Sequence, residues 1–357
     1  MKKIAEVLIS KKFLTAAIAI LLAAMFVCEF SARRRVVGAE RETYKLGTVV
    51  RITAYGSDKK ALDAELDAAV NEITRLENLF SVNIASSEIS KINSSDRGAG
   101  VGAETAAIIT EALRIAGETD GAFDPTIEPI VKLWGIATDH PRVPGKGEIE
   151  GALPLVDYRR VSVSGGNVSK GTGQKLDLGG IAKGWIADRL SDKLRADGIK
   201  SALIDLGGNL SVVGESSERR AWRLGLQRPS SSRGEYFAII EATDLSVVTS
   251  GPYERYFDRD GVRYHHIFDP KTGYPAESDL SSVSIVSKNS ADADALCTAF
   301  FVMGLEKSVR FLKAHKDISA VLLTKDMKKV YATTNIKDKL TVEDKSMSLE
   351  FIGGRED

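Results

Sequence analysis

Four short clusters of titratable and hydroxyl side chains stand out along the chain, and the densest is Tyr264–Pro275, YHHIFDPKTGYP. A turn needs the Asp-Pro and Gly residues of this stretch for its backbone angles, but it does not need the adjacent histidines His265 and His266. Histidine titrates near neutral pH and can move a proton. A lone histidine at a strand end is more often structural, but a tandem pair near Arg255 and Arg263 favours a site.

The second cluster is Asp177–Gly184, DLGGIAKG, which opens a predicted helix. Glycines at a helix start let the backbone approach a ligand, and the amides there attract phosphate. Lys183 adds a positive charge. The spacing is not that of a Walker loop, and glycine motifs are weak signals. A plain glycine turn beside a solvated lysine explains this segment equally well on its own.

The third cluster, ADADALCT, begins a helix and contains Asp294 and Thr298. Residues four apart share one helical face, so these two side chains offer two hard oxygens to a Mg²⁺ ion. The competing interpretation is structural. Asp292 would cap the helix and Asp294 would sit in its first turn, where the helix dipole favours a carboxylate.

The fourth cluster is GAFDPT, residues 121–126, in a loop rich in glycine and proline. An aromatic ring beside a carboxylate suits a flat heterocycle, with Phe123 against the ring and Asp124 accepting from its N–H groups.

The elements that must position these clusters mix strands and helices without regular alternation, so the sequence predicts an α+β fold. We expect one compact domain over residues 43–335, preceded by a targeting segment and linker (1–42) and followed by a charged C-terminal tail (336–357). Alternating or short continuous apolar residues mark the predicted strands, and apolar residues at helical spacing mark the predicted helices. Predicted strands are 44–55, 201–213, 222–227, 236–241, 245–249, 262–268, 281–286, 318–324 and 329–333; predicted helices are 59–80, 103–119, 181–195 and 291–314.

Charge and cysteine content exclude several classes of protein. The chain has 49 basic and 49 acidic residues, a formal net charge of zero, and no basic stripe, which argues against nucleic-acid binding. Its two cysteines, Cys28 and Cys297, lie in different parts of the chain and predict no disulfide in the domain. No Cys/His metal cluster occurs, so any bound metal should have oxygen ligands.

An uncharged apolar run, Phe13–Cys28, follows four lysines at the N-terminus and precedes three arginines. Its length suits a signal-peptide core or a short membrane anchor. Three alternatives remain: an uncleaved anchor, which we favour, a cleaved signal peptide, or a lipoprotein acylated on Cys28. In each, we expect the body to be exported to the cell-envelope side of the inner or cytoplasmic membrane.

Five motifs, DLGGIAKGWIAD, ALIDLGGN, TSGPYERYF, HHIFDPKTGYP and ADALCTAFFVMG, occur in this order. Together they resemble the FAD:protein FMN transferase family, the ApbE-type flavin transferases, over residues 43–335. The resemblance implies an exported or membrane-tethered α+β enzyme that binds FAD and Mg²⁺. Such an enzyme splits the FAD pyrophosphate, attaches FMN through a phosphoester to a threonine of a partner protein, and releases AMP.

The resemblance also implies roles for individual residues. Asp294 and Thr298 would bind Mg²⁺ through their side chains, and Gly180 through its backbone carbonyl. His266 would line the phosphate and ribityl region, and either His266 or an aspartate near the metal, such as Asp294, would accept the proton of the attacking hydroxyl. The remaining residues expected to contact FAD are Leu46 (where the family usually has methionine), Ala122, Phe123, Asp124, Asp177, Lys183 and Ile267.

One departure from the family pattern bears on the reaction. Relatives commonly have tyrosine at the position of Asn83, where an aromatic ring could stack on the adenine. Asn83 offers hydrogen bonds instead and leaves room for water. The sequence therefore predicts Mg²⁺-dependent hydrolysis of FAD to FMN and AMP, alongside or instead of transfer. A third alternative is a flavin-binding lipoprotein without catalytic activity.

Overall fold

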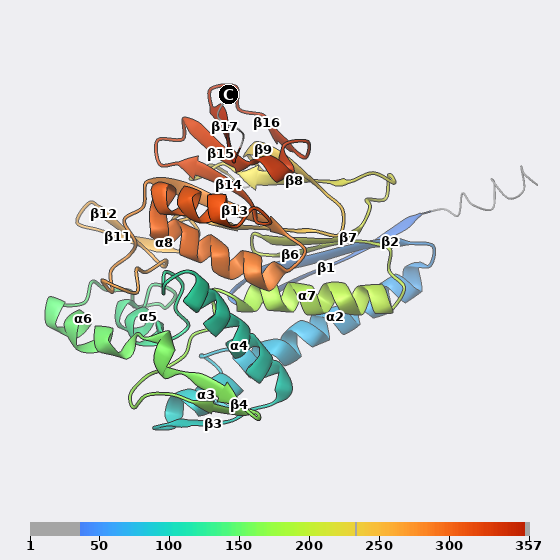
Figure 1. Cartoon of the computed structure of the whole chain (residues 1–357). Helices are drawn as coiled ribbons and strands as arrows, with labels where there is room; N and C mark the ends of the chain where they lie inside the picture. The colour runs from blue at the N-terminus through green and yellow to red at the C-terminus, as the bar shows by residue number, and fades with distance from the viewer. Residues whose placement is uncertain (1–35, 233, 354–357) are drawn as a thin grey trace, which may run out of the picture.

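In the computed structural model, which describes residues 36–232 and 234–353, a nine-stranded sheet forms the centre of the fold (Figure 1). Neighbouring strands are antiparallel except for β15 and β17, which are parallel. In sheet order the strands are β1 (Val37–Lys45), β2 (Thr48–Gly56), β6 (Ser201–Leu206), β7 (Asn209–Gly214), β10 (Ser246–Ser250), β13 (Leu280–Ser287), β14 (Ser319–Thr324), β15 (Lys329–Thr333) and β17 (Ser348–Ile352).

Helices cover one face of this sheet and a small second sheet covers part of the other (Figure 1). Successive residues of a strand point to opposite faces, so Val248 of β10 packs in the helix-side core and Val247 in the other. Because both faces are covered, most residues of the central strand β13 are buried, including the polar residues Ser282 and Ser284. The helix layer comprises α2 (Lys59–Phe80), α4 (Ala103–Glu118), α7 (Ala182–Ala196) and α8 (Ser290–Ala314), and the second sheet comprises β8 (Trp222–Gln227), β9 (Tyr236–Ala242) and β16 (Leu340–Val342).

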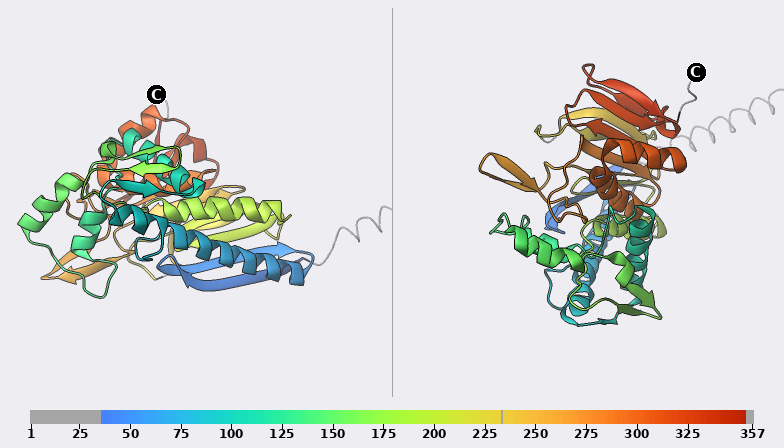
Figure 2. Two further views of the ribbon diagram at one scale, coloured as in Figure 1. Left: turned by 90° about the horizontal axis from the view of Figure 1, so that it is seen from below. Right: turned by 60° about the vertical axis from the view of Figure 1, so that its left-hand side comes forward.

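Shorter elements extend the helix side of the molecule (Figure 2). Among them, the hairpin of β11 (Tyr256–Arg259) and β12 (Val262–His265) lies against α5 (Glu128–Trp134), where the rings of Trp134 and Tyr264 are 5.3 Å apart. The others are α3 (Glu88–Ser94), α6 (Lys146–Ala152), β3 (Gly98–Gly100), β4 (Ser162–Ser164), β5 (Asn167–Ser169) and two turns of 3₁₀ helix, η1 (Leu153–Leu155) and η2 (Tyr158–Arg160). A third 3₁₀ turn, η3 (Thr334–Ile336), follows β15, and its Ile336 packs in the core beside the second sheet.

The α+β fold and the four long helices predicted from sequence are confirmed, but several strand boundaries differ. The segment 201–213 forms two strands, β6 and β7, and the strand predicted at 262–268 ends at His265. The strand expected at 44–55 is a hairpin whose two-residue turn is Leu46 (φ 55°) and Gly47 (φ 68°), so Val37–Lys45 belongs to the sheet and not to a linker. The expected tail also contributes strands: β16 and β17 pair with β9 and β15. These strands are short, of three and five residues, and lie in a segment rich in charged residues, which hid them from a search for apolar runs.

The N-terminal apolar run and Cys28 lie outside the described residues. Within the described residues, no helix has the length and apolar character needed to span a bilayer.

Helix α8 is interrupted at Gly304, whose backbone angles (φ 73°, ψ 179°) are accessible essentially only to glycine. Asp279 stabilises the break, because its Oδ1 accepts a hydrogen bond of 2.7 Å from the Leu305 N–H. A Cβ atom on Gly304 would lie 2.8 Å from the same oxygen.

We therefore expect Gly304→Ala to lower the free energy of unfolding by about 1–3 kcal/mol, from backbone strain and the clash with Asp279. Urea denaturation of the purified protein measures it. Gly151→Ala is the control, since a Cβ there meets no atom within 4 Å and the residue is helical. Equal stabilities of the two variants would contradict the interpretation of the break as strained.

Candidate functional site

The site begins where α7 crosses the start of α8. A Cβ on Gly184 would lie 2.1 Å from the carbonyl oxygen of Ser290, so only glycine permits this approach. The Gly184 N–H then donates a 3.0 Å hydrogen bond to Oδ2 of Asp294, and Lys183 Nζ lies 3.3 Å from Oδ1. Asp294 is 3% exposed. The negative charge of the buried carboxylate is therefore stabilised by the ammonium group of Lys183 and by the amide of Gly184 near the start of α7.

Three predicted metal ligands meet at this crossing. Thr298 lies one helical turn after Asp294, and a Cβ on Gly180 would be 3.6 Å from its Oγ1 and 3.1 Å from the ring of Phe123. The crossing therefore brings a carboxylate, a hydroxyl and the glycine backbone close together. The described residues hold no group of three or more His, Cys, Asp or Glu side chains able to bind a metal. The donors here are hard oxygens, which fit Mg²⁺ better than a softer ion.

A second group of charges surrounds the first. Asp177 accepts a 2.7 Å hydrogen bond from the Gly179 N–H. Burial raises the pKa of this carboxyl, although that hydrogen bond and the positive charges of Arg255 and Lys183 act in the opposite direction. The Arg255 guanidinium donates a 2.9 Å hydrogen bond to the Gly47 carbonyl, which connects the β1–β2 turn to the site.

His266 is uncharged in this environment. Burial lowers its pKa to about 3, and the nearby charges of Arg255 and Lys183 contribute in the same direction. Its Nδ1 lies 3.2 Å from the Arg255 carbonyl oxygen. A carbonyl can only accept, so this contact assigns the proton to Nδ1 and leaves a lone pair on Nε2. His265 has a structural role, with Nε2 3.2 Å from the Ala276 carbonyl oxygen and its ring against Phe301.

The carboxylate of Asp124 differs from expectation. It is 6% exposed and accepts from the Thr126 N–H (2.8 Å), the Thr126 hydroxyl (2.6 Å) and the Tyr158 N–H (3.0 Å). The side chain thus stabilises its own loop, as aspartate often does by hydrogen bonding to the backbone two residues on, and its contact with FAD stays a prediction. The same loop contains Ala122 and Phe123. The ring of Phe123 lies next to Gly180, which places this loop beside the crossing.

The remaining predicted residues lie at varying distances from the crossing. Ile267 is buried, and its carbonyl accepts from the Ala276 N–H. Leu46 donates its N–H to Glu77 Oε1 at 2.8 Å, beside the Gly47 carbonyl bound by Arg255. Asn83 is exposed in the loop between α2 and α3. No contact in the structure joins Asn83 to the crossing.

The sequence analysis assigned no role to Arg255 or Gly184. Arg255 was noted in the sequence because it lies near the tandem histidines. In the structure it lies between β10 and β11. Gly184 carried no signal of its own, because its role depends on the helix that crosses it.

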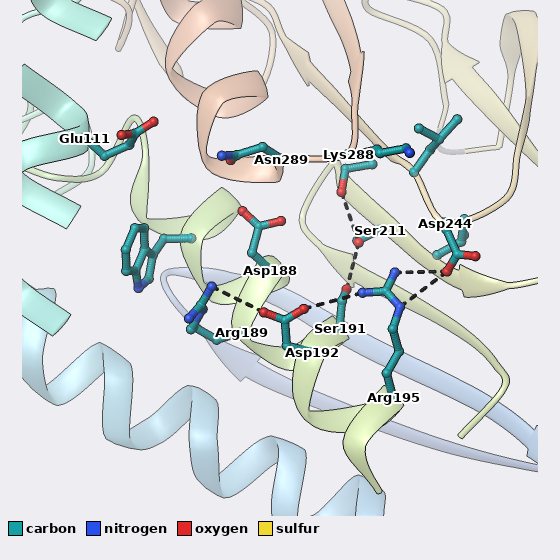
Figure 3. Close-up of a pocket in the computed structure, with 14 residues that line it drawn as sticks. Glu111, Asp188, Arg189, Ser191, Asp192, Arg195, Ser211, Asp244, Lys288 and Asn289 are labelled. Atoms are coloured by element: carbon teal, nitrogen blue, oxygen red, sulfur yellow. Dashed lines mark hydrogen bonds and ion pairs between the residues drawn. The ribbon is translucent and has the colours of Figure 1, made fainter. Parts of the chain in front are cut away.

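A polar groove of about 320 Å³ lies elsewhere on α7 (Figure 3). Asp188 in this groove accepts from the N–H groups of Ser290 and Ala291, and so caps α8. Arg195 pairs with Asp244, and the hydroxyls of Ser191, Ser211 and Ser246 form a chain (Figure 3). None of the predicted FAD or metal ligands lines it. These contacts connect α7 to the sheet and to α8 and do not extend the site.

The chain is similar to proteins of one family. The sequence profile of the ApbE family matches residues 46–322. The FAD:protein FMN transferase of Treponema pallidum is 38% identical over 341 residues, 89% of this chain and 93% of the relative. That of Klebsiella pneumoniae is 36% identical and covers 79% of this chain and 87% of the relative.

Solved structures agree with the sequence relatives. The ApbE protein of Thermotoga maritima superposes with a TM-score of 0.79 at 33% identity, covering 85% of this chain and 99% of the other. The flavin transferase ApbE of Vibrio cholerae superposes with a TM-score of 0.76 at 29% identity, with the same coverage.

Proposed function

The chain belongs to the ApbE family, and we propose that it transfers FMN from FAD to a threonine of a partner protein, with Mg²⁺ bound and AMP released. The observation that carries the proposal is the buried Asp294 at the helix crossing, beside Lys183 and one turn from Thr298. A single buried carboxylate with hydroxyl and carbonyl oxygens close by suits an ion that takes its other ligands from a diphosphate.

Asp294, Thr298 and the Gly180 carbonyl would hold the Mg²⁺ ion. When bound, the metal supplies positive charge that stabilises the anion developing on the leaving phosphate. Lys183 and Arg255 add positive charge on the same side, and both act on the pKa of His266 and of Asp177. These side chains would orient the pyrophosphate of FAD for attack.

In the proposed step, the threonine oxygen of the acceptor attacks the phosphorus that carries the riboflavin moiety. The new P–O bond forms as the bond to AMP breaks, and AMP leaves with the electron pair. The threonine proton passes to Nε2 of His266, whose lone pair is available because Nδ1 is bound to the Arg255 carbonyl. A bound diphosphate also offsets the charges of Arg255 and Lys183, which raises the basicity of His266 when substrate is present.

Hydrolysis is the second candidate reaction, and Asn83 favours it. Water would replace threonine in the same step and give free FMN and AMP. Asn83 is exposed and supplies no ring for the adenine. A flavin carrier without turnover is the third candidate. The names of the curated relatives favour transfer over both.

We also propose that the body lies on the cell-envelope side of the membrane. The apolar run Phe13–Cys28 with its basic flanks supports export and anchoring. The mass of the mature protein and its distribution between membrane and soluble fractions test this proposal.

The transfer itself is tested with the full chain, FAD, Mg²⁺ and a cell-envelope extract from the source cells. Denaturing gels detect covalent flavin by its fluorescence, and chromatography detects AMP and FMN. A fluorescent protein band with AMP supports transfer, AMP with free FMN alone supports hydrolysis, and no product supports a carrier.

Asp294→Ala should lower AMP release by about two orders of magnitude or more, because it removes the carboxylate proposed to hold the metal. Chelation of Mg²⁺ should lower the wild-type rate to a similar level. Asp292→Ala is the matched control on the same helix, since its side chain pairs with Arg114 instead. Full activity of Asp294→Ala would refute the metal site.

Asn83→Tyr should lower the ratio of free FMN to protein-bound FMN, because a ring at this position can stack on adenine and exclude water; such stacking contributes about 1–3 kcal/mol. Asn83→Leu adds bulk without an aromatic face and separates stacking from exclusion. Both products are quantified in the same reaction. An unchanged ratio in the tyrosine variant would remove Asn83 from the account of hydrolysis.

The pH profile tests His266. Because its folded-state pKa is lowered to about 3, the ring stays neutral throughout pH 5–8, and kcat/KM for the free enzyme should show no titration of this residue in that range. His266→Gln should lower the rate by about 10²–10⁴-fold at every pH in the range. His265→Gln is the comparison. A wild-type inflection near pH 6.5 that disappears in His266→Gln would show that the histidine is charged there.

A further inference from the structure

The hairpin of β11 and β12 projects from the body as an arm (Figures 1 and 2). Asp260 (φ 52°) and Gly261 (φ 76°) form its two-residue turn, the kind that favours a twisted hairpin. Its strands pair with each other in a sheet of two and belong to no larger sheet among the described residues.

Both ends of this arm are at the proposed site. Arg255 immediately precedes β11 and His266 immediately follows β12, and the His266 N–H donates to the Arg255 carbonyl at 3.1 Å. A segment lying along the arm would therefore run towards the residues that are proposed to act on FAD.

The arm is packed on one face by Phe257 and Tyr264, and on the other face only at its base, where the ring of His265 lies against Phe301. The rings of Phe257 and Tyr264 stack 5.3 Å apart on the side of Trp134. On the other face the Arg263 guanidinium lies 3.7 Å from the ring centre of Tyr256, which is 41% exposed. Val262, at the tip of the arm on the face of Phe257 and Tyr264, is also exposed, at 49%. The arm thus presents aromatic and aliphatic surface that the fold itself does not cover.

The register identifies the free backbone groups of the arm. In an antiparallel pair, hydrogen-bonded and non-hydrogen-bonded positions alternate. The 255–266 pair is hydrogen-bonded, so the 257–264 and 259–262 pairs are too. The N–H and C=O groups of Tyr256 and Asp258 consequently face outward along the edge of β11, and those of Arg263 and His265 face outward along β12.

The two edges are not equivalent near the site. Beyond β12, the Ile267 carbonyl accepts from the Ala276 N–H at 2.8 Å, and Phe268 bridges to Pro275. The segment 274–276 therefore occupies that edge at the base of the arm. No strand occupies the edge of β11 in the part of the chain that the structure describes.

We propose that the outer edge of β11 binds an extended segment of the acceptor protein, which adds a strand to the arm and brings its hydroxyl residue to the site. An open strand edge recognises another backbone by its row of N–H and C=O groups, and the neighbouring side chains then select among sequences. This inference rests on the proposed transfer, because only that reaction requires a polypeptide substrate.

Asp258→Pro tests the edge directly. Proline removes the outward N–H but no hydrogen bond within the hairpin, and proline is tolerated on edge strands in this orientation. Asp258→Ala is the matched control, since it also loses the carboxylate that pairs with Arg263 but keeps the N–H. The probe is the protein band that becomes fluorescent in the transfer assay, purified without its flavin.

Relative to Asp258→Ala, we expect Asp258→Pro to lower kcat/KM for transfer to this acceptor roughly twofold to tenfold, the effect of one hydrogen bond. FAD binding, measured by quenching of flavin fluorescence, should be unchanged, as should AMP release in the absence of acceptor. Equal transfer by the two variants would overturn the docking site and leave the transfer reaction standing. Absence of any labelled protein with the wild-type chain would overturn the proposed transfer, and the docking site with it.

Hydrogen exchange of the wild-type chain decides the matter if Asp258→Pro fails to bind FAD. The acceptor is used with its flavin-receiving residue changed to valine, so that the complex does not turn over. Slower exchange at Tyr256 and Asp258 on adding this acceptor supports docking on β11. Unchanged exchange there, or protection of the edge strand β1 (Val37–Lys45) instead, overturns it.

Discussion

The crossing of α7 and α8 is the constraint on which the site depends. Because Gly184 has no side chain, the start of α7 can lie against the carbonyl of Ser290. Each helix then supplies hydrogen-bond acceptors for free N–H groups of the other. Asp294 of α8 accepts from the amide of Gly184, while Asp188 of α7 accepts from the amides of Ser290 and Ala291. The carboxylates of the buried Asp294 and the half-buried Asp188 thus bind the free N–H groups that every helix start presents. The geometry of the proposed metal ligands follows from this reciprocal capping.

Two cations, Lys183 and Arg255, lie among the titratable groups around the crossing. Lys183 lies beside the buried Asp294, and Arg255 with Lys183 acts on Asp177 and His266. Desolvation raises the pKa of the buried carboxyl of Asp177 and lowers that of the imidazole of His266, so it favours the neutral form of both groups. A neutral imidazole beside Arg255 and Lys183 suits an anionic substrate, because the negative charge of the substrate interacts favourably with both cations. This is why the diphosphate of FAD fits better than an uncharged ligand.

The motifs at helix starts and strand ends could be singled out from the sequence, although capping and turn formation explained several of them equally well, and their roles as ligands stay predictions. Asp294 and Thr298 were found from helical spacing, which is local. The hydrogen bonds of Asp124 to Thr126 were not foreseen, because an aspartate that turns back to its own loop has the same sequence as one that faces a ligand, and its contact with FAD stays a prediction. The role of Gly184 depends on residues of α8 more than a hundred positions away, and periodicity carries no information about such contacts. The strands β16 and β17 are short and lie in a segment rich in charged residues, so they gave no clear apolar pattern.

The site has a rigid half and an exposed half, and Arg255 joins them. The rigid half is the helix crossing, whose residues are buried in the main core. The exposed half consists of two hairpins, because Arg255 binds the Gly47 carbonyl at the turn of β1–β2 and itself begins the β11–β12 arm. Chemistry on a dinucleotide needs fixed positions for phosphate and metal, whereas a protein substrate must enter from outside. Changes in the hairpins can therefore alter which polypeptide is accepted while the crossing, and with it the chemistry on FAD, stays the same.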